Sequence, residues 1–471
     1  MTGKRSWTSV LVLLFTLLLA QTLAGCGTVQ ETGEQRTEQT TAPVEETPRV
    51  MRVGSLTVTP ELESLSLEEA GAKIEDLLSA SADLQGVKEI SLGVTDATLE
   101  QLRVVESAFP NAEVSWKVSL LGGEIDSRAE NLNLGTAEDG DLKEILSALA
   151  RLPEVKALEL APKDGVTALS FESLSALAAA APEAELNCRF ELYGQTADWT
   201  TEKLKYFKTA IGDEGVESFR EALPYLRSLR LLRFEDCGIT DNDMMAALRA
   251  DFPEKNVVWS INISGYTFMT DTTLINDGDT NLLNDSNAYL LRYMPDVLYL
   301  DIGHNHHLTN IEFVRSFPKL QVVILTLGEV RDITPLEDCP DLEFLECHGT
   351  PIGDISVLAD KEKLEYLNIA NLPNLTDLTP LYGLKQLKIV RICGTTFTHI
   401  KPADVQALKE ALPDTFVSDY GGDPNSSGGW RFTVNGDKSK PTERYKLLRE
   451  QMRYDLNWQE RLSNSPSGEE D

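Results

Sequence analysis

Apolar residues recur at a fixed spacing between Pro295 and Pro402, in the frame L-x-x-L-x-L. The frame occurs five times, at steps of 22 or 23 residues. Its last two apolar positions alternate with other residues, which is typical of a short strand with one buried face. The pattern therefore predicts one such strand in each unit. The apolar positions of the five frames are Val297, Leu300 and Ile302; Leu320, Val323 and Leu325; Leu342, Leu345 and Cys347; Leu364, Leu367 and Ile369; Leu387, Val390 and Ile392.

A second motif follows three of these strands. It reads Asp-Ile-Thr-Pro-Leu at 332–336, Asp-Ile-Ser-Val-Leu at 354–358 and Asp-Leu-Thr-Pro-Leu at 377–381. A period of 22 to 23 residues is that of a leucine-rich repeat. With this motif, residues 295–402 resemble the internalin type of bacterial leucine-rich repeat. The resemblance implies an α/β solenoid, with a parallel sheet on the concave face and helices and 3₁₀ turns on the convex face.

Upstream, a longer period of 71 or 72 residues relates three segments, 110–122, 182–194 and 253–265. Each alternates apolar residues and ends at a glycine, which predicts a long strand entering a turn. Helical patterns precede them, and weaker frames of the same kind predict earlier strands. These weaker frames are Val87, Ile90 and Leu92; Val155, Leu158 and Leu160; Leu229, Leu232 and Phe234.

We therefore expect residues 55–420 to form one solenoid. Residues 55–293 would contain irregular, longer repeats, and residues 294–420 the internalin-type repeats. Such an array needs a cap at each end. At the front, the capping box of residues 66–69 predicts a helix that continues to about Ser81.

A C-terminal cap is the interpretation favoured for the last segment, 421–471, which would hold a linker and a helix within 441–462. The residues predicted to share one helical face are Tyr445, Leu448, Met452 and Leu456. The alternative is an amphipathic helix on a membrane. Acidic residues interrupt the polar face that should then be basic, which favours the cap.

The N-terminus reads as a bacterial lipoprotein signal. Lys4 and Arg5 precede an apolar run, and Leu23-Ala24-Gly25 stands directly before Cys26. We expect cleavage after residue 25 and acyl chains such as palmitate on Cys26, so that the protein is extracytoplasmic and anchored to the cell membrane. An ordinary signal peptide with a chance cysteine is the alternative. Residues 26–54 are rich in Thr, Glu and Gln and predict a disordered linker.

Composition opposes a nucleic-acid partner. With 43 Lys+Arg against 75 Asp+Glu, the formal charge is −32, which repels phosphate. Five cysteines follow Cys26, too widely spaced for a disulfide framework, so we expect isolated thiols.

No catalytic motif is evident, and we predict neither a catalytic residue nor a metal site nor a cofactor. G-x-S-x-G, H-E-x-x-H, Walker A and C-x-x-C are all missing from the sequence. His304, His306 and His307 share one loop, for which a solvated loop is favoured over a metal site. The acidic run from Asp277 lacks the later ligands of an EF-hand. An enzyme that uses dispersed Asp and Glu residues is the least favoured alternative.

The candidate site is a stripe on the concave face, because residues between the buried ones point out of the sheet. Its predicted apolar members are Tyr299, Val322, Phe344, Tyr366 and Ile389, and its predicted polar members are Asp301, Glu346, His348 and Arg391. Exposed aromatic residues with polar neighbours are typical of protein-binding surfaces. Alternatively, these side chains cover one another, or an end cap covers them.

We therefore predict a monomeric, non-enzymatic surface lipoprotein whose solenoid binds a protein or glycan partner in adhesion or recognition. The alternative is an envelope scaffold for the organism's own wall or secreted proteins. Fold alone does not separate the two, since repeat scaffolds host many functions.

Overall fold

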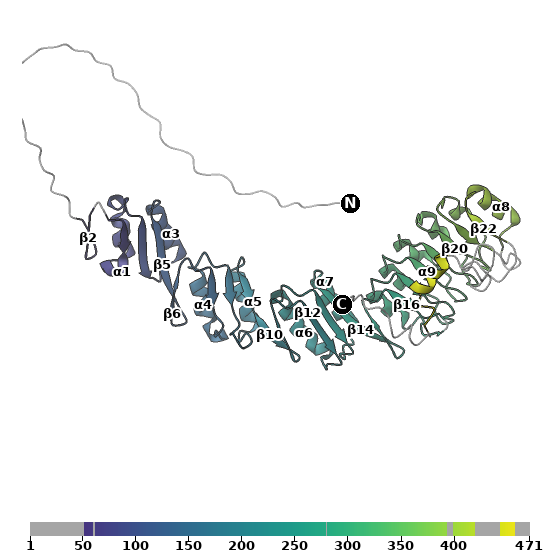
Figure 1. Cartoon of the computed structure of the whole chain (residues 1–471), viewed down its shortest axis with the longest axis horizontal. Coiled ribbons are helices and arrows are strands. Elements are labelled where there is room, and N and C mark those ends of the chain that lie inside the picture. The colour runs from purple at the N-terminus through teal and green to yellow at the C-terminus, as the bar shows by residue number, and fades with distance from the viewer. Residues whose placement is uncertain (1–50, 60–61, 279, 393–398, 420–442, 457–471) are drawn as a thin grey trace, which may run out of the picture.

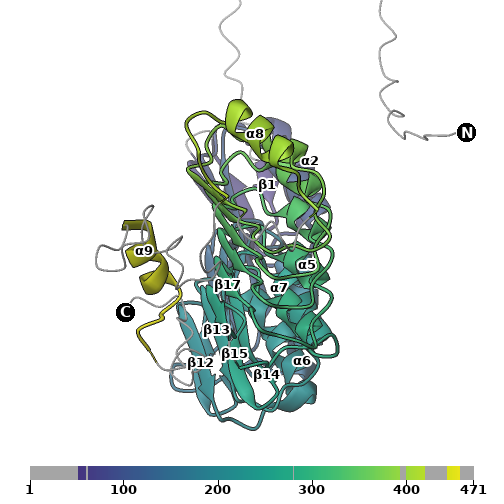
Figure 2. The same ribbon diagram turned by 90° about the vertical axis from the view of Figure 1, so that its right-hand side faces the viewer.

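The structure is a computed structural model that describes residues 51–59, 62–278, 280–392, 399–419 and 443–456. Four blocks of parallel strands follow one another along an arc (Figure 1). Strands form one face of the chain and helices the opposite face (Figure 2). One continuous apolar core runs between the two faces from Val53 to Val417. The fold is a leucine-rich-repeat solenoid, as predicted.

The first block is a four-stranded sheet preceded by a small hairpin. Its strands are β1 (Met51–Val53) and β2 (Leu56–Val58) in the hairpin, then β3 (Ser64–Ser66), β4 (Glu89–Val94), β5 (Glu113–Leu120) and β6 (Gly123–Asp126). Its helices are α1 (Leu67–Ala70), α2 (Ile74–Ser79) and α3 (Leu99–Ala108), with a 3₁₀ turn, η1 (Ser81–Asp83).

The second and third blocks repeat this plan. The second holds β7 (Asn131–Asn133), β8 (Ala157–Glu159), β9 (Glu185–Asn187), β10 (Arg189–Leu192), β11 (Gln195–Asp198), η2 (Asp139–Asp141), α4 (Leu142–Leu149) and α5 (Phe171–Ala180). The third holds β12 (Lys203–Phe207), β13 (Leu231–Glu235), β14 (Asn256–Ile263), β15 (Tyr266–Met269), α6 (Gly212–Ala222), η3 (Leu223–Tyr225) and α7 (Asn242–Asp251).

Each of these blocks ends in an antiparallel hairpin, β5–β6, β10–β11 or β14–β15. The two turn residues have positive φ in all three hairpins, as in a type I′ turn. They are Leu121 (51°) and Gly122 (76°), Tyr193 (50°) and Gly194 (82°), and Ser264 (51°) and Gly265 (91°). The strand that returns from each turn stops the parallel stacking. The expected single parallel sheet is therefore divided into separate sheets over one continuous core.

The fourth block is a seven-stranded parallel sheet. Its strands are β16 (Leu274–Asn276), β17 (Tyr299–Asp301), β18 (Val322–Ile324), β19 (Phe344–Glu346), β20 (Tyr366–Asn368), β21 (Ile389–Arg391) and β22 (Phe416–Ser418). Short 3₁₀ turns lie between them: η4 (Ala288–Tyr293), η5 (Glu312–Ser316), η6 (Thr334–Asp338), η7 (Ser356–Asp360) and η8 (Thr379–Leu381). The sheet begins at β16, one strand before the boundary predicted at residue 294.

Two predictions about the N-terminal end need correction. Residues 51–54, which were assigned to the predicted 26–54 linker, belong to a folded hairpin, because β1 pairs with β2 and Val53 is buried. The single helix predicted to reach Ser81 is two helices. Ser66 does accept the N–H of Glu69, but Gly71 then takes a left-handed conformation (φ 59°) that ends α1.

The C-terminal helix is also placed differently from the prediction. Beyond the tight repeats, α8 (Pro402–Ala411) buries Val405 and Leu408 in the solenoid core, and β22 adds the last described strand. The predicted capping helix is α9 (Glu443–Gln451), which lies over the strand side of the fourth block instead of at the end of the array (Figure 2).

The stacked core predicts that substitutions lower the free energy of unfolding much more at buried positions than at exposed ones. Leu367 is fully buried in β20, so Leu367→Ala should lower the free energy of unfolding by about 2–5 kcal/mol, from lost burial and the cavity left behind. Urea denaturation followed by circular dichroism measures this change. Lys363→Ala, at an exposed ion pair with Asp341, is the control and should change little. Equal effects at both positions would contradict the layered core.

Candidate functional site

The parallel register of the fourth block stacks the predicted stripe residues strand by strand. One row consists of Leu274, Tyr299, Val322, Phe344, Tyr366, Ile389 and Phe416, and the neighbouring row of Asn276, Asp301, Ile324, Glu346, Asn368, Arg391 and Ser418. The predicted stacking order is confirmed. Leu274 and Phe416 were not predicted, because their strands lie outside the regular frame. The apolar pair Leu274-Ile275 between Thr273 and Asn276 shows no alternation that would indicate β16.

The predicted exposure of the stripe is wrong, because α9 covers it. Val322 is 0% exposed, Phe344 2% and Ile389 7%, whereas Tyr299 and Tyr366 are half-buried. The covering side chains are Leu448 and Met452, both fully buried and separated by one helical turn. They form a second apolar cluster with the stripe, distinct from the solenoid core. We call this surface, with rows from Leu274 to Phe416, the strand face.

Arg444 fixes the start of α9 over two aromatic rings. Its guanidinium carbon lies 5.3 Å from the Phe344 ring centre and 5.7 Å from that of Tyr366, within the range of cation–π attraction. Burial lowers the pKa of Arg444, while the nearby acids Glu343 and Glu365 act in the opposite direction. Its Nη1 donates to Gln451 Oε1 at 2.8 Å, which keeps the guanidinium against the strand face.

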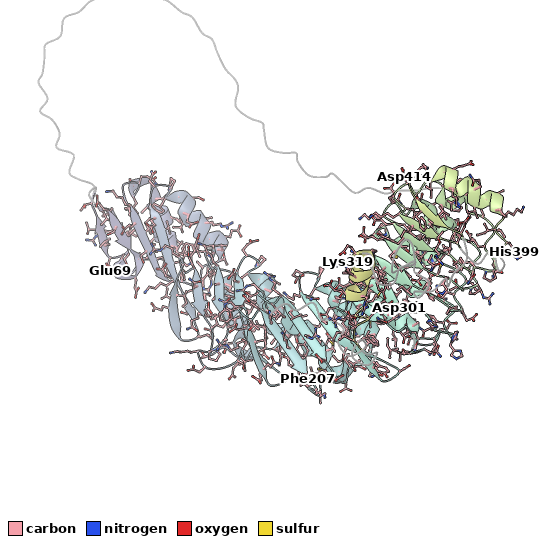
Figure 3. The ribbon with its side chains drawn as sticks, turned by 45° about the vertical axis from the view of Figure 1, so that its right-hand side comes forward. Glu69, Phe207, Asp301, Lys319, His399 and Asp414 are labelled. Atoms are coloured by element: carbon pink, nitrogen blue, oxygen red, sulfur yellow. The ribbon has the colours of Figure 1, made fainter. Side chains whose placement is uncertain are left out.

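Polar contacts hold the other end of the C-terminal segment. The Tyr454 hydroxyl donates to Asp301 Oδ2 at 2.6 Å, and Asn276 Nδ2 donates to the Met452 carbonyl at 2.5 Å. Figure 3 shows Asp301 on the fourth block beside the C-terminal helix. Asp301, predicted as an exposed polar member of the stripe, is therefore a buried acceptor. The segment 443–456 runs across the strands, from β19 and β20 at Arg444 to β16 and β17 at Tyr454.

Glu346 and His348, two further predicted members, form a buried polar cluster with Thr326. The Thr326 hydroxyl donates to Glu346 Oε1 at 3.1 Å, and His348 Nδ1 lies 3.3 Å from both neighbours. All three side chains are buried. In a nucleophilic relay, one imidazole nitrogen faces the hydroxyl and the other faces the acid. Here His348 Nδ1 faces both, so the cluster does not have the geometry of such a relay. Arg391, the last predicted member, is also buried and donates to Ser418 Oγ at 2.9 Å.

The other candidate residues show no converging geometry. Within the ranges that the structure describes, no group of three His, Cys, Asp or Glu residues is placed to hold a metal ion. His306 and His307 are exposed on the loop predicted to be solvated. Cys188, Cys237, Cys339 and Cys347 are buried free thiols, as expected, whereas Cys393 and Cys26 lie outside the described residues.

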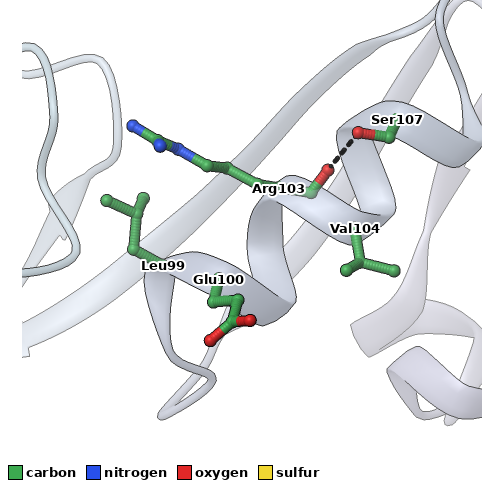
Figure 4. Close-up of a pocket in the computed structure, with 5 residues that line it drawn as sticks. All are labelled: Leu99, Glu100, Arg103, Val104 and Ser107. Carbon is green, nitrogen blue, oxygen red and sulfur yellow. Dashed lines mark hydrogen bonds between the residues drawn. The ribbon is translucent and has the colours of Figure 1, made fainter. Parts of the chain in front are cut away.

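Two neighbouring hollows lie near α3 in the first block. Leu99, Glu100, Arg103, Val104 and Ser107 line one of about 530 Å³, where Ser107 Oγ donates to the Arg103 carbonyl at 2.8 Å (Figure 4). The other, also about 530 Å³, lies between α2 and α3. Its charged lining residues, Lys73, Glu75 and Asp96, are exposed. Neither hollow holds a buried polar group aimed at a ligand.

Among the described helices, none is both long and apolar enough to cross a membrane. The predicted signal segment and Cys26 lie outside the described residues.

A buried acid supports the edge of the strand face. Asp277 follows β16 and accepts the N–H groups of Leu282 at 3.3 Å and Leu283 at 3.0 Å, as well as the Thr280 hydroxyl. Burial raises the pKa of Asp277 from 3.8 to about 7, although these donors act in the opposite direction. The carboxyl group of Asp277 thus holds the conformation of its own loop.

The raised pKa of Asp277 predicts a pH-dependent stability. The stability that Asp277 contributes is fully present below 3.8, the pKa of its carboxyl group in the unfolded chain. It is lost as the pH rises through about 7, because the unfolded chain releases the proton more readily than the folded protein. Asp277→Asn should therefore reduce the loss of stability between about pH 4 and 7, measured as the shift in urea midpoint. The exposed Glu362→Gln is the control. An unchanged pH profile in Asp277→Asn would contradict the assignment.

The contacts of α9 predict that two side chains hold it in place. Burial of a Leu or Met side chain contributes about 1.5–3 kcal/mol, so Leu448→Ser with Met452→Ser should release the helix. Amide hydrogen exchange should accelerate in residues 443–456 and stay unchanged in β17–β20, because the solenoid core is a separate cluster. Leu447→Ser, at a 45% exposed position on the same helix, is the matched control. Protection of 443–456 in the double variant would contradict this.

Two solved structures that are similar to this chain share low sequence identity with it. No protein-family model and no curated protein matches the chain. Among solved structures, internalin C2 of Listeria monocytogenes is 20% identical, with 46% of this chain and 80% of that chain covered and a TM-score of 0.26. A leucine-rich-repeat protein of Leptospira interrogans is 14% identical, with 76% and 90% covered and a TM-score of 0.25. TM-scores this low indicate no overall superposition, so the leucine-rich-repeat fold is established by the chain's own repeats and sheet register.

Proposed function

We propose that this protein is a non-enzymatic binding protein, displayed outside the cell, whose strand face recognises a protein partner in adhesion or recognition. The observation that carries the proposal is α9 itself. A protein helix occupies the strand face through two apolar side chains, one arginine on two rings and two polar contacts. A surface that holds one protein segment in this way has the chemistry to hold another.

The character of the strand face also supports a protein partner over a glycan. Its central row is aliphatic and aromatic, and Phe344 and Tyr366 lie 6.1 Å apart with their rings tilted by 32°. Apolar anchors with a polar surround are typical of protein interfaces. Most of the polar side chains are already paired inside the sheet, for example Thr326 with Glu346, which leaves few of them to bind sugar hydroxyls.

Display would depend on Cys26. The sequence supports lipidation at this residue, and residues 27–50 would separate the lipid from β1. The fourth block is the part of the array farthest along the chain from this anchor, where an extracellular partner would meet it.

Crosslinking on intact cells tests the proposed function. A photoreactive residue at Glu343 or Glu365, beside the Arg444 site, should capture a protein that the same group at Asp164, in the second block, does not capture. Capture from the organism's own envelope would indicate a scaffold, and capture of a foreign protein would indicate adhesion. Equal capture at all three positions, or none, would contradict a binding site on the strand face.

Anchoring and folding are expected to be independent. Cys26→Ser should release the protein into the medium, while its circular dichroism spectrum and urea midpoint match those of the anchored protein in detergent. The serine keeps the size of the side chain and removes only the thiol that accepts the lipid. Retention in the membrane fraction would show that another segment anchors the chain.

A further inference from the structure

We infer that α9 is an internal mimic of the partner, and that the strand face takes a short basic amphipathic helix that displaces α9. This inference rests on the proposed function and specifies its ligand class. The helix would carry two apolar residues one turn apart, as Leu448 and Met452 are, with an arginine one turn before them, as Arg444 is. It would lie across the strands, from β20 towards β16.

Charge favours a basic helix on this surface. Residues 443–456 contain Arg444, Lys446, Arg449 and Arg453 against three acids, whereas the whole chain carries −32. On the receiving side, Glu343 and Glu365 act on the Arg444 guanidinium, and Asp301 accepts the Tyr454 hydroxyl. An acidic helix would bring like charge towards Glu343 and Glu365, although Glu365 also pairs with Lys388 at 2.6 Å.

The size of α9 suits an occupant that can be exchanged. The helix has nine residues, fewer than an isolated helix needs to be stable in water, so contact with the strand face keeps it helical. Its tether to the same chain raises its effective concentration at the strand face without adding contacts. A partner helix with the same contacts competes against this tethered segment and gains access when α9 leaves.

The solenoid does not depend on α9 for its own core. Leu448 and Met452 belong to the cluster on the strand face, and the continuous core from Val53 to Val417 contains neither. Departure of α9 would uncover Val322, Phe344 and Ile389 together. These are the apolar residues that a second helix would cover.

A labelled synthetic peptide of residues 441–458 provides the probe for this exchange. It is added to the full chain carrying Cys26→Ser, with α9 either native or altered by Leu448→Ser and Met452→Ser. We expect the altered chain to bind the peptide at least about tenfold more tightly than the native chain, because the tethered competitor is lost. Leu447→Ser should bind it like the native chain, and Phe344→Ser in the altered chain should abolish binding.

The crosslinked cell-surface partner provides the second measurement. Its capture should rise by a similar factor when Leu448 and Met452 are replaced, and excess peptide should suppress it. Partner capture that is unchanged or reduced by the replacement overturns the inference but leaves the proposed function intact. If neither the native nor the altered chain captures a partner, the proposed function is contradicted, whether or not the peptide binds.

Two further outcomes would also overturn the inference. One is equal peptide affinity in the native and altered chains, since α9 would then not compete for the strand face. The other is a dimer of the native chain that the altered chain loses in sedimentation, since the occupant would then be the α9 of a second copy.

Discussion

Stacking of one repeat on the next is the constraint on which the whole structure depends. In the fourth block a unit contributes one strand of three residues, whose backbone groups are paired only by the units on either side. A unit such as that around Leu345 and Leu367 buries its apolar residues against the next layer, not within itself. The 3₁₀ turns and helices then complete the opposite side, and hairpins end the parallel stacking where the long repeats meet.

This stacking creates the strand face as a consequence. Identical positions of successive strands align in rows, so one apolar residue per unit becomes a continuous apolar surface outside the core. Water contact with such a surface is unfavourable, and α9 removes it by placing Leu448 and Met452 over the central rows. The same regularity that builds the solenoid therefore also builds the surface that α9 covers.

Electrostatics makes the surface selective as well as apolar. Arg444 lies over two aromatic rings in a solenoid rich in carboxylates, and the rings and nearby acids offset part of the cost of burying its guanidinium. On the opposite edge, Asp301 and Asn276 bind the end of the segment through hydrogen bonds. The segment from Arg444 to Tyr454 is thus held by charge at one end and by hydrogen bonds at the other, with apolar contacts between.

Much of this protein was determined by the sequence alone. Periodicity identified the repeats, the buried positions and the rows of the strand face, because each depends on residues within one unit or at a constant step. It also identified Leu448 and Met452 as one apolar helical face. Tertiary structure alone decided that α9 covers Phe344 and Val322, that hairpins divide the sheet, and that Gly71 breaks the first helix. The pairing of the C-terminal segment with the strand face joins residues as far as 176 positions apart, and no periodic signal encodes a contact between two surfaces that each satisfy their own local pattern.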